Sequence, residues 1–143
     1  MIDPANPVVA LCARGMEAES GGDRDLAARL FLEAWERAAD DYEACIAAHY
    51  VARHQSEPAE LLRWNQVALQ RADRVGDDRV AGFYPSLQLN LGFALERSGD
   101  RMGARDAYLA AAARLERLPE DRYGEIVRDG VRRALARVRA AGD

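Results

Sequence analysis

The chain of 143 residues contains no lysine, so all twenty of its basic residues are arginine. Without a lysine amine it cannot form a Schiff base with a carbonyl substrate, and it has no lysine to bind a transferred phosphate. Cysteine is scarce as well: Cys12 and Cys45 are the only two, which is too few for a disulfide framework. Each lies in an apolar helical run, where a free cysteine behaves as a small hydrophobic residue.

Long apolar runs are also absent, since no stretch approaches the length of a transmembrane span. The first residues lack the basic region and the long apolar core of a signal peptide. We therefore expect a cytoplasmic protein with no membrane partner. The formal net charge of −4 is mildly acidic, and such a chain is not expected to bind nucleic acid.

Catalytic motifs are missing from the sequence. It contains no Gly-x-Ser-x-Gly elbow and no glycine-rich phosphate loop after a strand. Cys45 and His49 stand four residues apart, a spacing that could place two ligands on one metal or pair a thiol with a base. No further ligand or orienting group with suitable spacing is evident, so we expect no catalytic residue, no metal and no cofactor.

Alternation of β-branched residues is absent, and the pattern that replaces it is helical. In residues 91–111, Leu91-Gly92 lies in one predicted helix, Gly99-Asp100 forms the turn, and small or aromatic residues mark a second helix. The same skeleton occurs earlier in the chain at one constant separation, which we call the repeat offset. Seven residues recur at this offset, in the same order. The earlier set is Gly15, Gly22, Asp23, Arg24, Ala27, Phe31 and Ala34, and the later set is Gly92, Gly99, Asp100, Arg101, Ala104, Tyr108 and Ala111.

This skeleton resembles the tetratricopeptide repeat, which carries a Leu-Gly pair, an alanine four residues before an aromatic, and a later proline. Leu91-Gly92, Ala104, Tyr108 and Pro119 match that pattern, whereas Gln88 and Leu95 replace its tryptophan and tyrosine. The resemblance implies an all-α, right-handed solenoid in a single domain, 1–143. Its three helix–turn–helix repeats are expected at about 7–39, 40–76 and 79–118, with a C-terminal capping helix at about 122–140. The middle repeat is degenerate, and Ala48, Trp64 and Val67 occupy the corresponding places.

Local signals place the ends of these helices. Asn6 before Pro7, and Asp23 after a pair of glycines, are predicted N-caps, and Asp40 with Glu43 predicts a capping box. Turns are expected near Gly22, 55–57, 76–78, Gly99 and Pro119. The fifth helix begins either at Pro85 or near Val80 with a kink. Gly92 is expected to pack against Ala104 and Tyr108, because a glycine inside a helix costs about 1 kcal/mol and close packing compensates for it.

In tetratricopeptide-like folds the first helices of successive hairpins line a concave groove, so the resemblance implies where a ligand would bind. The residues expected to line one concave surface are Tyr42, His49, Arg53, Asn90, Phe93 and Arg97. The spacings, seven and four in the first trio and three and four in the second, place each trio on one helix face. Arginine can hold a carboxylate with two parallel hydrogen bonds, so this surface suits an anionic group. The alternative is that these side chains pack between helices or pair with nearby acids.

We expect a noncatalytic module that recognises a protein or peptide, including one with an anionic group. Two other functions stay open: a small-molecule or enzymatic site around His49 and Arg53, and a homo-oligomeric structural role. The arginine-rich C-terminal segment could face an acidic partner or RNA. A solvated helix face is the preferred interpretation there, because no aromatic residues interleave the arginines and the chain is acidic.

Overall fold

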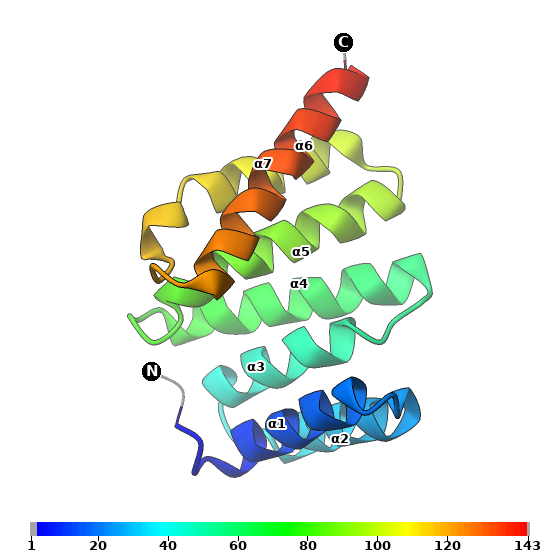
Figure 1. Cartoon of the computed structure of the whole chain (residues 1–143), viewed down its shortest axis with the longest axis vertical. Coiled ribbons are helices and arrows are strands. Elements are labelled where there is room, and N and C mark those ends of the chain that lie inside the picture. Colours follow the sequence, from blue (N-terminus) through cyan, green and yellow to red (C-terminus); the bar gives the residue numbers. More distant parts are fainter. Residues whose placement is uncertain (1–2, 143) are drawn as a thin grey trace. The chain divides into compact units, whose positions relative to one another are not determined.

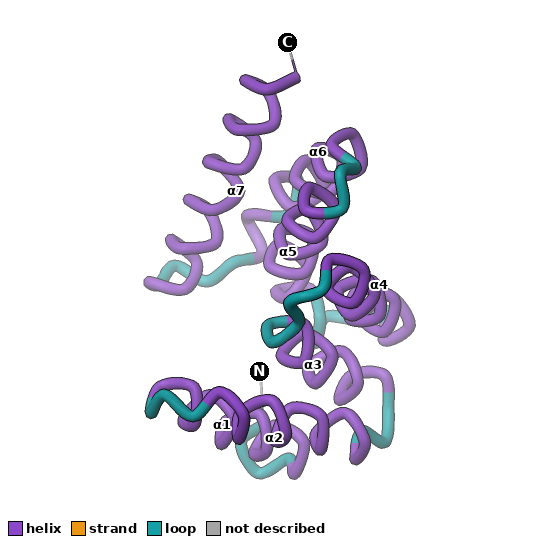
Figure 2. The backbone as a smooth tube through the Cα atoms, turned by 90° about the vertical axis from the view of Figure 1, so that its right-hand side faces the viewer, coloured by secondary structure: helices purple, strands orange, loops and turns teal. Residues whose placement is uncertain are grey.

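The computed structural model describes residues 3–142, with side chains as far as Arg139, and its regular elements are all helical (Figures 1 and 2). The α-helices are α1 (Pro7–Ser20), α2 (Arg24–Arg37), α3 (Asp41–Ala52), α4 (Pro58–Val75), α5 (Tyr84–Arg97), α6 (Arg101–Ala112) and α7 (Arg122–Gly142). Short 3-10 turns cover Ala81–Phe83 and Leu115–Arg117. The predicted all-α class, with at least six helices and no sheet, is confirmed for the described residues.

The helices begin where short polar side chains cap them. The side chain of Asn6 accepts hydrogen bonds from the amides of Val8 and Val9, at 2.8 and 3.2 Å, and Pro7 opens α1. Asp23 and Asp100 cap α2 and α6 in the same way. Removing such a cap typically costs about 1 kcal/mol, so these local signals contribute directly to where the chain turns.

The capping box predicted at the start of α3 forms only in part. Asp40 accepts a hydrogen bond from the amide of Glu43 at 2.8 Å, as predicted. The carboxylate of Glu43, however, accepts from the amide of Ala39 at 2.9 Å and from the side chain of Asn6 at 2.8 Å. Glu43 therefore joins the loop before α3 to the cap of α1, which is a contact that short-range spacing does not reveal.

The start of α5 combines the two predicted alternatives. A 3-10 turn over Ala81–Phe83 leads directly into the α-helix at Tyr84. Pro85 then lies in the first helical turn, where its missing N–H is not needed. The proline is buried, and the helix continues from it without interruption.

The chain divides into two compact units at the junction between Arg79 and Val80. In the unit up to Arg79, α1–α2 and α3–α4 form antiparallel hairpins, and α3 packs on α2 and α1. In the unit from Val80, α5 and α6 form a hairpin, and α7 packs on α6 and α5. Each helix thus packs on its neighbours in sequence within its unit. The single domain, its repeat bounds and the solenoid stay predictions.

One close contact recurs in the hairpins α1–α2 and α5–α6. Gly15 lies under the ring of Phe31, and Gly92 lies under the ring of Tyr108; a Cβ atom at either glycine would come within 2.8 Å of the ring Cζ. Both aromatic side chains are completely buried. The predicted contact between Gly92 and Tyr108 is therefore confirmed, and the absence of a side chain allows the two helices to approach.

The turns of these two hairpins match as well. Gly22 and Gly99 adopt positive φ angles of 84° and 87°, a conformation that glycine accepts without strain. The backbone amides of the aspartates that follow, Asp23 and Asp100, donate hydrogen bonds to the carbonyl oxygens of Ala18 and Leu95 in the first helix, each at 2.9 Å. Such a C-terminal motif satisfies carbonyl groups that the end of a helix leaves open.

The core of the second unit consists of aromatic, aliphatic and small residues from α5, α6 and α7, together with Leu118 from the loop before α7. Its buried members are Leu89, Ala104, Tyr108, Ala111, Leu118, Val127, Val131, Ala134 and Val138. Burying one large apolar side chain contributes about 1.5–3 kcal/mol, so the buried valines of α7 help to hold that helix on the hairpin.

Candidate functional site

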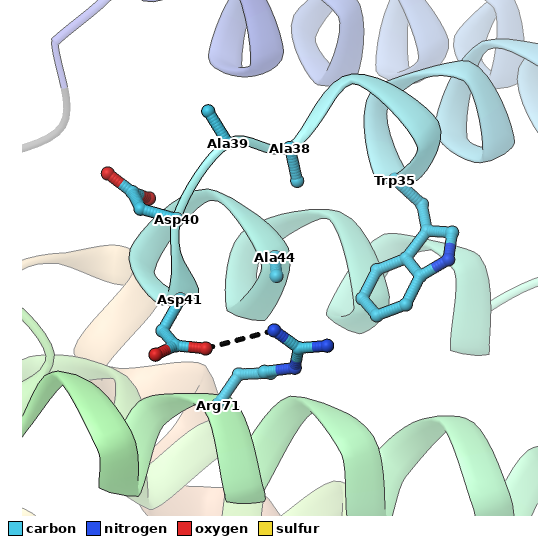
Figure 3. Close-up of a pocket in the computed structure, with 7 residues that line it drawn as sticks. All are labelled: Trp35, Ala38, Ala39, Asp40, Asp41, Ala44 and Arg71. Carbon is cyan, nitrogen blue, oxygen red and sulfur yellow. Dashed lines mark hydrogen bonds and ion pairs between the residues drawn. The ribbon is translucent and has the colours of Figure 1, made fainter.

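A hollow of about 280 Å³ lies in the first unit, between the end of α2 and the start of α3 (Figure 3). Its wall includes the indole ring of Trp35, and its floor carries the carboxylate of Asp41. Arg71 from α4 enters this hollow, where it binds Asp41 at 2.9 Å and lies 5.4 Å from the centre of the Trp35 ring. The carboxylate of Asp41 in this hollow is thus already paired with a guanidinium of the same unit. The sequence did not predict this hollow, because Asp41 and Arg71 are far apart along the chain and no local pattern joins them.

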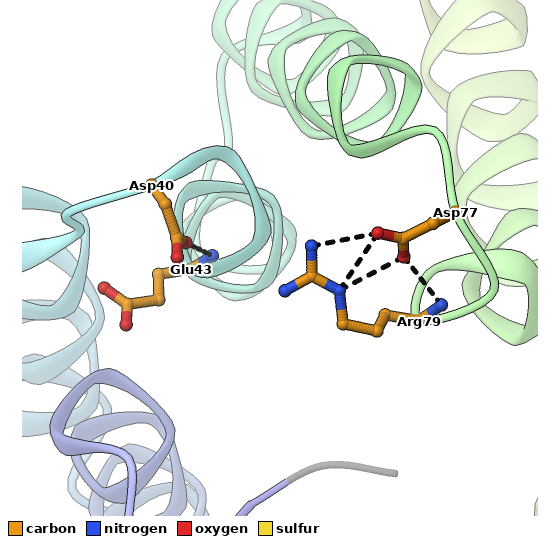
Figure 4. Close-up of polar contacts among 4 residues, drawn as sticks. All are labelled: Asp40, Glu43, Asp77 and Arg79. Carbon is orange, nitrogen blue, oxygen red and sulfur yellow. Dashed lines mark hydrogen bonds and ion pairs between the residues drawn. The ribbon is translucent and has the colours of Figure 1, made fainter.

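Tyr42, the first predicted site residue, lies in the first turn of α3 and is half-buried. The guanidinium of Arg79 lies 5.1 Å from the centre of its ring, a geometry suited to a cation–π contact. The carboxylate of Asp77 accepts hydrogen bonds from the guanidinium and from the backbone amide of Arg79, as Figure 4 shows. Burial raises the pKa of Tyr42, and Arg79 opposes that rise. One neighbour of the Tyr42 ring is therefore already a cation of the same unit.

His49 lies two turns further along α3, with its ring half-buried and packed edge-on against Tyr50 at 5.1 Å. Burial, aided by the nearby Arg53 guanidinium, lowers the pKa of His49 to about 4. The imidazole is consequently neutral at pH 7. It can donate or accept a hydrogen bond, but it does not attract an anion by charge.

Arg53 ends the α3 stripe, and it already binds a carboxylate of its own chain. Its guanidinium contacts Glu19 of α1 at 3.1 Å, while the other oxygen of Glu19 contacts Nε2 of His54 at 2.7 Å. About half of the Arg53 side chain stays exposed. The pairing alternative therefore applies to Arg53 in part: its guanidinium binds Glu19 and lies 5.5 Å from the centre of the Tyr50 ring, and the rest of the side chain is exposed.

The second predicted trio lies on α5. Asn90 is half-buried, whereas Phe93 and Arg97 are exposed, Phe93 to 39%. The Phe93 ring packs edge-on against Tyr108 at 5.9 Å and has the Arg137 guanidinium 5.5 Å from its centre. No ion pair of Arg97 is found among the described residues, which leaves its charge available for binding.

The two trios belong to different units. Tyr42, His49 and Arg53 precede the junction at Arg79, and Asn90, Phe93 and Arg97 follow it. Each trio lies along one helix, as predicted from its spacing. Their combination into one concave surface stays a prediction.

A polar cluster at Glu96 was not predicted. Arg137 of α7 donates to both oxygens of Glu96, at 3.1 and 2.6 Å, and the buried hydroxyl of Tyr108 donates to the same carboxylate. The arginine lowers the pKa of Glu96, and burial raises the pKa of Tyr108. The signal was present in the sequence, since Glu96 follows Glu19 by the same repeat offset that relates the two hairpins.

The cysteines have little capacity for chemistry in the folded chain. Cys12 and Cys45 are both buried and unpaired, and burial raises the pKa of each thiol to about 12. The reactive thiolate is therefore negligible at neutral pH. Within residues 3–139, no three histidine, cysteine, aspartate or glutamate side chains gather closely enough to hold a metal ion.

Comparisons with protein-family models, with curated proteins and with solved structures find no match to this chain. None of the described helices combines the length and the apolar character needed to cross a membrane.

Proposed function

We propose that this chain is a noncatalytic, tetratricopeptide-like recognition module that binds a protein or peptide through the exposed faces of its first helices. The observation that carries the proposal is the recurrence of one hairpin, in which Gly15 and Phe31 in one unit correspond to Gly92 and Tyr108 in the other. Recurring helical hairpins present extended surfaces rather than one enclosed pocket, and such surfaces suit macromolecular ligands.

The residue after each of these glycines supports the proposal. Met16 and Phe93 are related by the same repeat offset, and their side chains are 38% and 39% exposed. Packing does not require a large apolar side chain to face solvent at the same place in two hairpins. Methionine and aromatic residues are enriched at protein interfaces, where they supply much of the contact energy.

Arginine on the same helices sets the chemistry of the partner in this proposal. Arg97 is exposed on α5, and Arg53 keeps an exposed side beyond its contact with Glu19. A guanidinium pairs well with a carboxylate, so the partner presents a chain terminus or acidic side chains. We place the module in the cytoplasm, in keeping with its two free thiols.

The experiment is affinity capture of the full chain from its source cells, followed by direct binding measurements on the partner identified by mass spectrometry. The proposal expects the variant Arg53→Ala with Arg97→Ala to lose binding by about tenfold or more, at a nearly unchanged midpoint of thermal unfolding. The matched control is Arg29→Ala with Arg105→Ala, which removes one arginine from the second helix of a hairpin in each unit. Equal binding by both variants and the parent would show that the assigned surface is wrong.

A further inference from the structure

The two units differ in charge. Residues 1–79 contain nine arginines and fifteen acidic residues, whereas residues 80–143 contain eleven arginines and nine acidic residues. The acidic character of the whole chain thus comes from its first part. The second unit is net basic, and many of its arginines lie on α7.

Within the second unit, α5 and α7 run in the same direction and are joined at three levels. Near their starts, the side chains of Ser86 and Tyr123 are hydrogen-bonded, and near their ends Glu96 binds Arg137. Between these, a Cβ atom at Gly130 would lie 3.0 Å from Leu89. The two helices therefore lie side by side along this length, and their neighbouring faces form one surface.

Apolar side chains are exposed along this surface. Phe93 of α5 is 39% exposed, and Tyr123 and Ile126 of α7 are 49% and 58% exposed. Tyr123 and Ile126 lie near the Ser86–Tyr123 contact at the start of the two helices, and Phe93 lies near the Glu96–Arg137 contact at their end. Large apolar groups exposed together and bordered by polar side chains are typical of interaction sites.

Cations border the same apolar residues. Arg97 follows Phe93 by four residues on α5, and Arg133 and Arg137 follow Ile126 by seven and eleven residues on α7, so each group shares a helix face. Arg137 is held by Glu96 but is about half exposed, and Arg133 contacts Asp129 only at 3.9 Å. Asp129 contacts Arg132 more closely, so the positive charge of Arg133 is weakly compensated.

We propose that this α5–α7 surface, made of Phe93, Arg97, Tyr123, Ile126, Arg133 and Arg137, binds an acidic peptide segment that carries apolar anchor residues. The inference rests on the proposed function and specifies the partner's chemistry and the unit that binds it. Carboxylates of the segment pair with Arg97 and Arg133, and its apolar side chains cover Phe93 and Ile126. An acidic protein segment is favoured over RNA because Ile126, 58% exposed at the centre of the proposal, is aliphatic: it packs against apolar anchor residues but offers no ring on which a base can stack.

The test is fluorescence anisotropy of the full chain with three labelled peptides of equal length. The first alternates glutamate or aspartate with leucine and phenylalanine, the second replaces the acids by glutamine and asparagine, and the third replaces the apolar residues by alanine. Only the first is expected to bind well, and added salt should weaken its binding. Arg97→Gln with Arg133→Gln should weaken it by about tenfold. The control Arg105→Gln with Arg139→Gln removes equal charge from the same unit, away from this surface, and should bind like the parent.

The inference is overturned if the first peptide fails to bind, if the neutral peptide binds equally, or if the control pair loses as much affinity as the surface pair. Tighter binding of poly(U) RNA through Arg97 and Arg133 would also overturn it. So would a sedimentation result in which the chain dimerises and the surface variant is monomeric, because a second copy would then be the occupant. If a captured partner requires Arg53 and Arg97 while the acidic peptide does not bind, the proposed function stands and only this inference fails.

Discussion

Glu19 and Glu96 occupy the same place in their hairpins, and each binds an arginine from a helix that packs on its hairpin. Glu19 of α1 holds Arg53 at the end of α3, and Glu96 of α5 holds Arg137 of α7. In both hairpins the glutamate lies four residues after the glycine that contacts the aromatic ring. Within each unit, the hairpin pattern therefore places the glutamate of an ion pair whose arginine comes from a helix outside the hairpin.

The two clusters differ where their aromatic residues differ. Tyr108 has a hydroxyl group, which donates to Glu96, whereas Phe31 has none. In the first unit the second oxygen of Glu19 contacts His54, whose ring lies 5.4 Å from that of Phe31. A histidine side chain thus takes the place of the phenol as the second partner of the carboxylate.

This difference predicts the stability of variants at Tyr108 and Glu96. Tyr108→Phe should lower the free energy of unfolding by about 0.5–1.5 kcal/mol, because Glu96 keeps Arg137. Glu96→Ala should cost about 1–3 kcal/mol, because the buried hydroxyl of Tyr108 loses its acceptor. In urea denaturation the double variant should cost less than the sum of the two. Additive losses would show that the hydroxyl and the carboxylate act independently.

A second prediction concerns the glycine under the aromatic ring. Gly92→Ala should destabilise the chain by about 1–3 kcal/mol, because the added Cβ would overlap the Tyr108 ring. The control is Gly21→Ala, where a Cβ would meet the carbonyl of Glu17 at an ordinary 3.5 Å and the φ angle of −83° suits alanine. Thermal unfolding of both variants checks the prediction, and equal midpoints would argue that α5 and α6 are not in such close contact.

A third prediction follows from His49. Its pKa is lowered to about 4 in the folded chain, against 6.5 for an ordinary histidine, so the unfolded chain takes up this proton first as the pH falls. The contribution of His49 to stability is therefore nearly constant above pH 6.5 and decreases between pH 6.5 and about 4. The loss from pH 7 to pH 5 should be about 2 kcal/mol. His49→Gln should remove most of this dependence in urea denaturation, and an unchanged slope would show that the ring is solvated.

A fourth prediction concerns the thiols. With their pKa raised to about 12, Cys12 and Cys45 should react with an aromatic disulfide reagent at pH 8 only as fast as the chain opens. Both should react rapidly in urea, which serves as the control for reagent and thiol content. The single variants Cys12→Ser and Cys45→Ser show which thiol is responsible for each part of the reaction. Rapid reaction of either thiol in the native chain would contradict its burial.

Local structure was largely predictable because its signals are short-range. The caps at Asn6 and Asp23 depend on hydrogen bonds to amides two or three residues away, so the sequence alone was sufficient to place them. The contact of Gly92 with Tyr108 was also predictable, because the same separation along the chain relates Gly15 to Phe31.

The candidate site was less predictable because its residues meet partners far along the chain. Arg53 of α3 binds Glu19 of α1, and Arg79 beyond α4 covers Tyr42 of α3, and neither pairing follows from periodicity. A helical stripe specifies which residues share a face, but not which long side chains reach that face. The sequence alone therefore does not distinguish Arg97, which is exposed, from Arg53, which already binds Glu19.

The central structural claim is that one hairpin recurs, with a glycine of its first helix lying under an aromatic ring of its second. It is tested most directly by the NMR chemical shifts of the Hα protons of Gly15 and Gly92. Ring currents should move both to high field, with nuclear Overhauser contacts from Gly15 to Phe31 and from Gly92 to Tyr108. Phe31→Leu should abolish the first displacement and leave the second in place. Ordinary helical shifts at either glycine, without contacts to the ring, would contradict the recurring hairpin on which the proposed function rests.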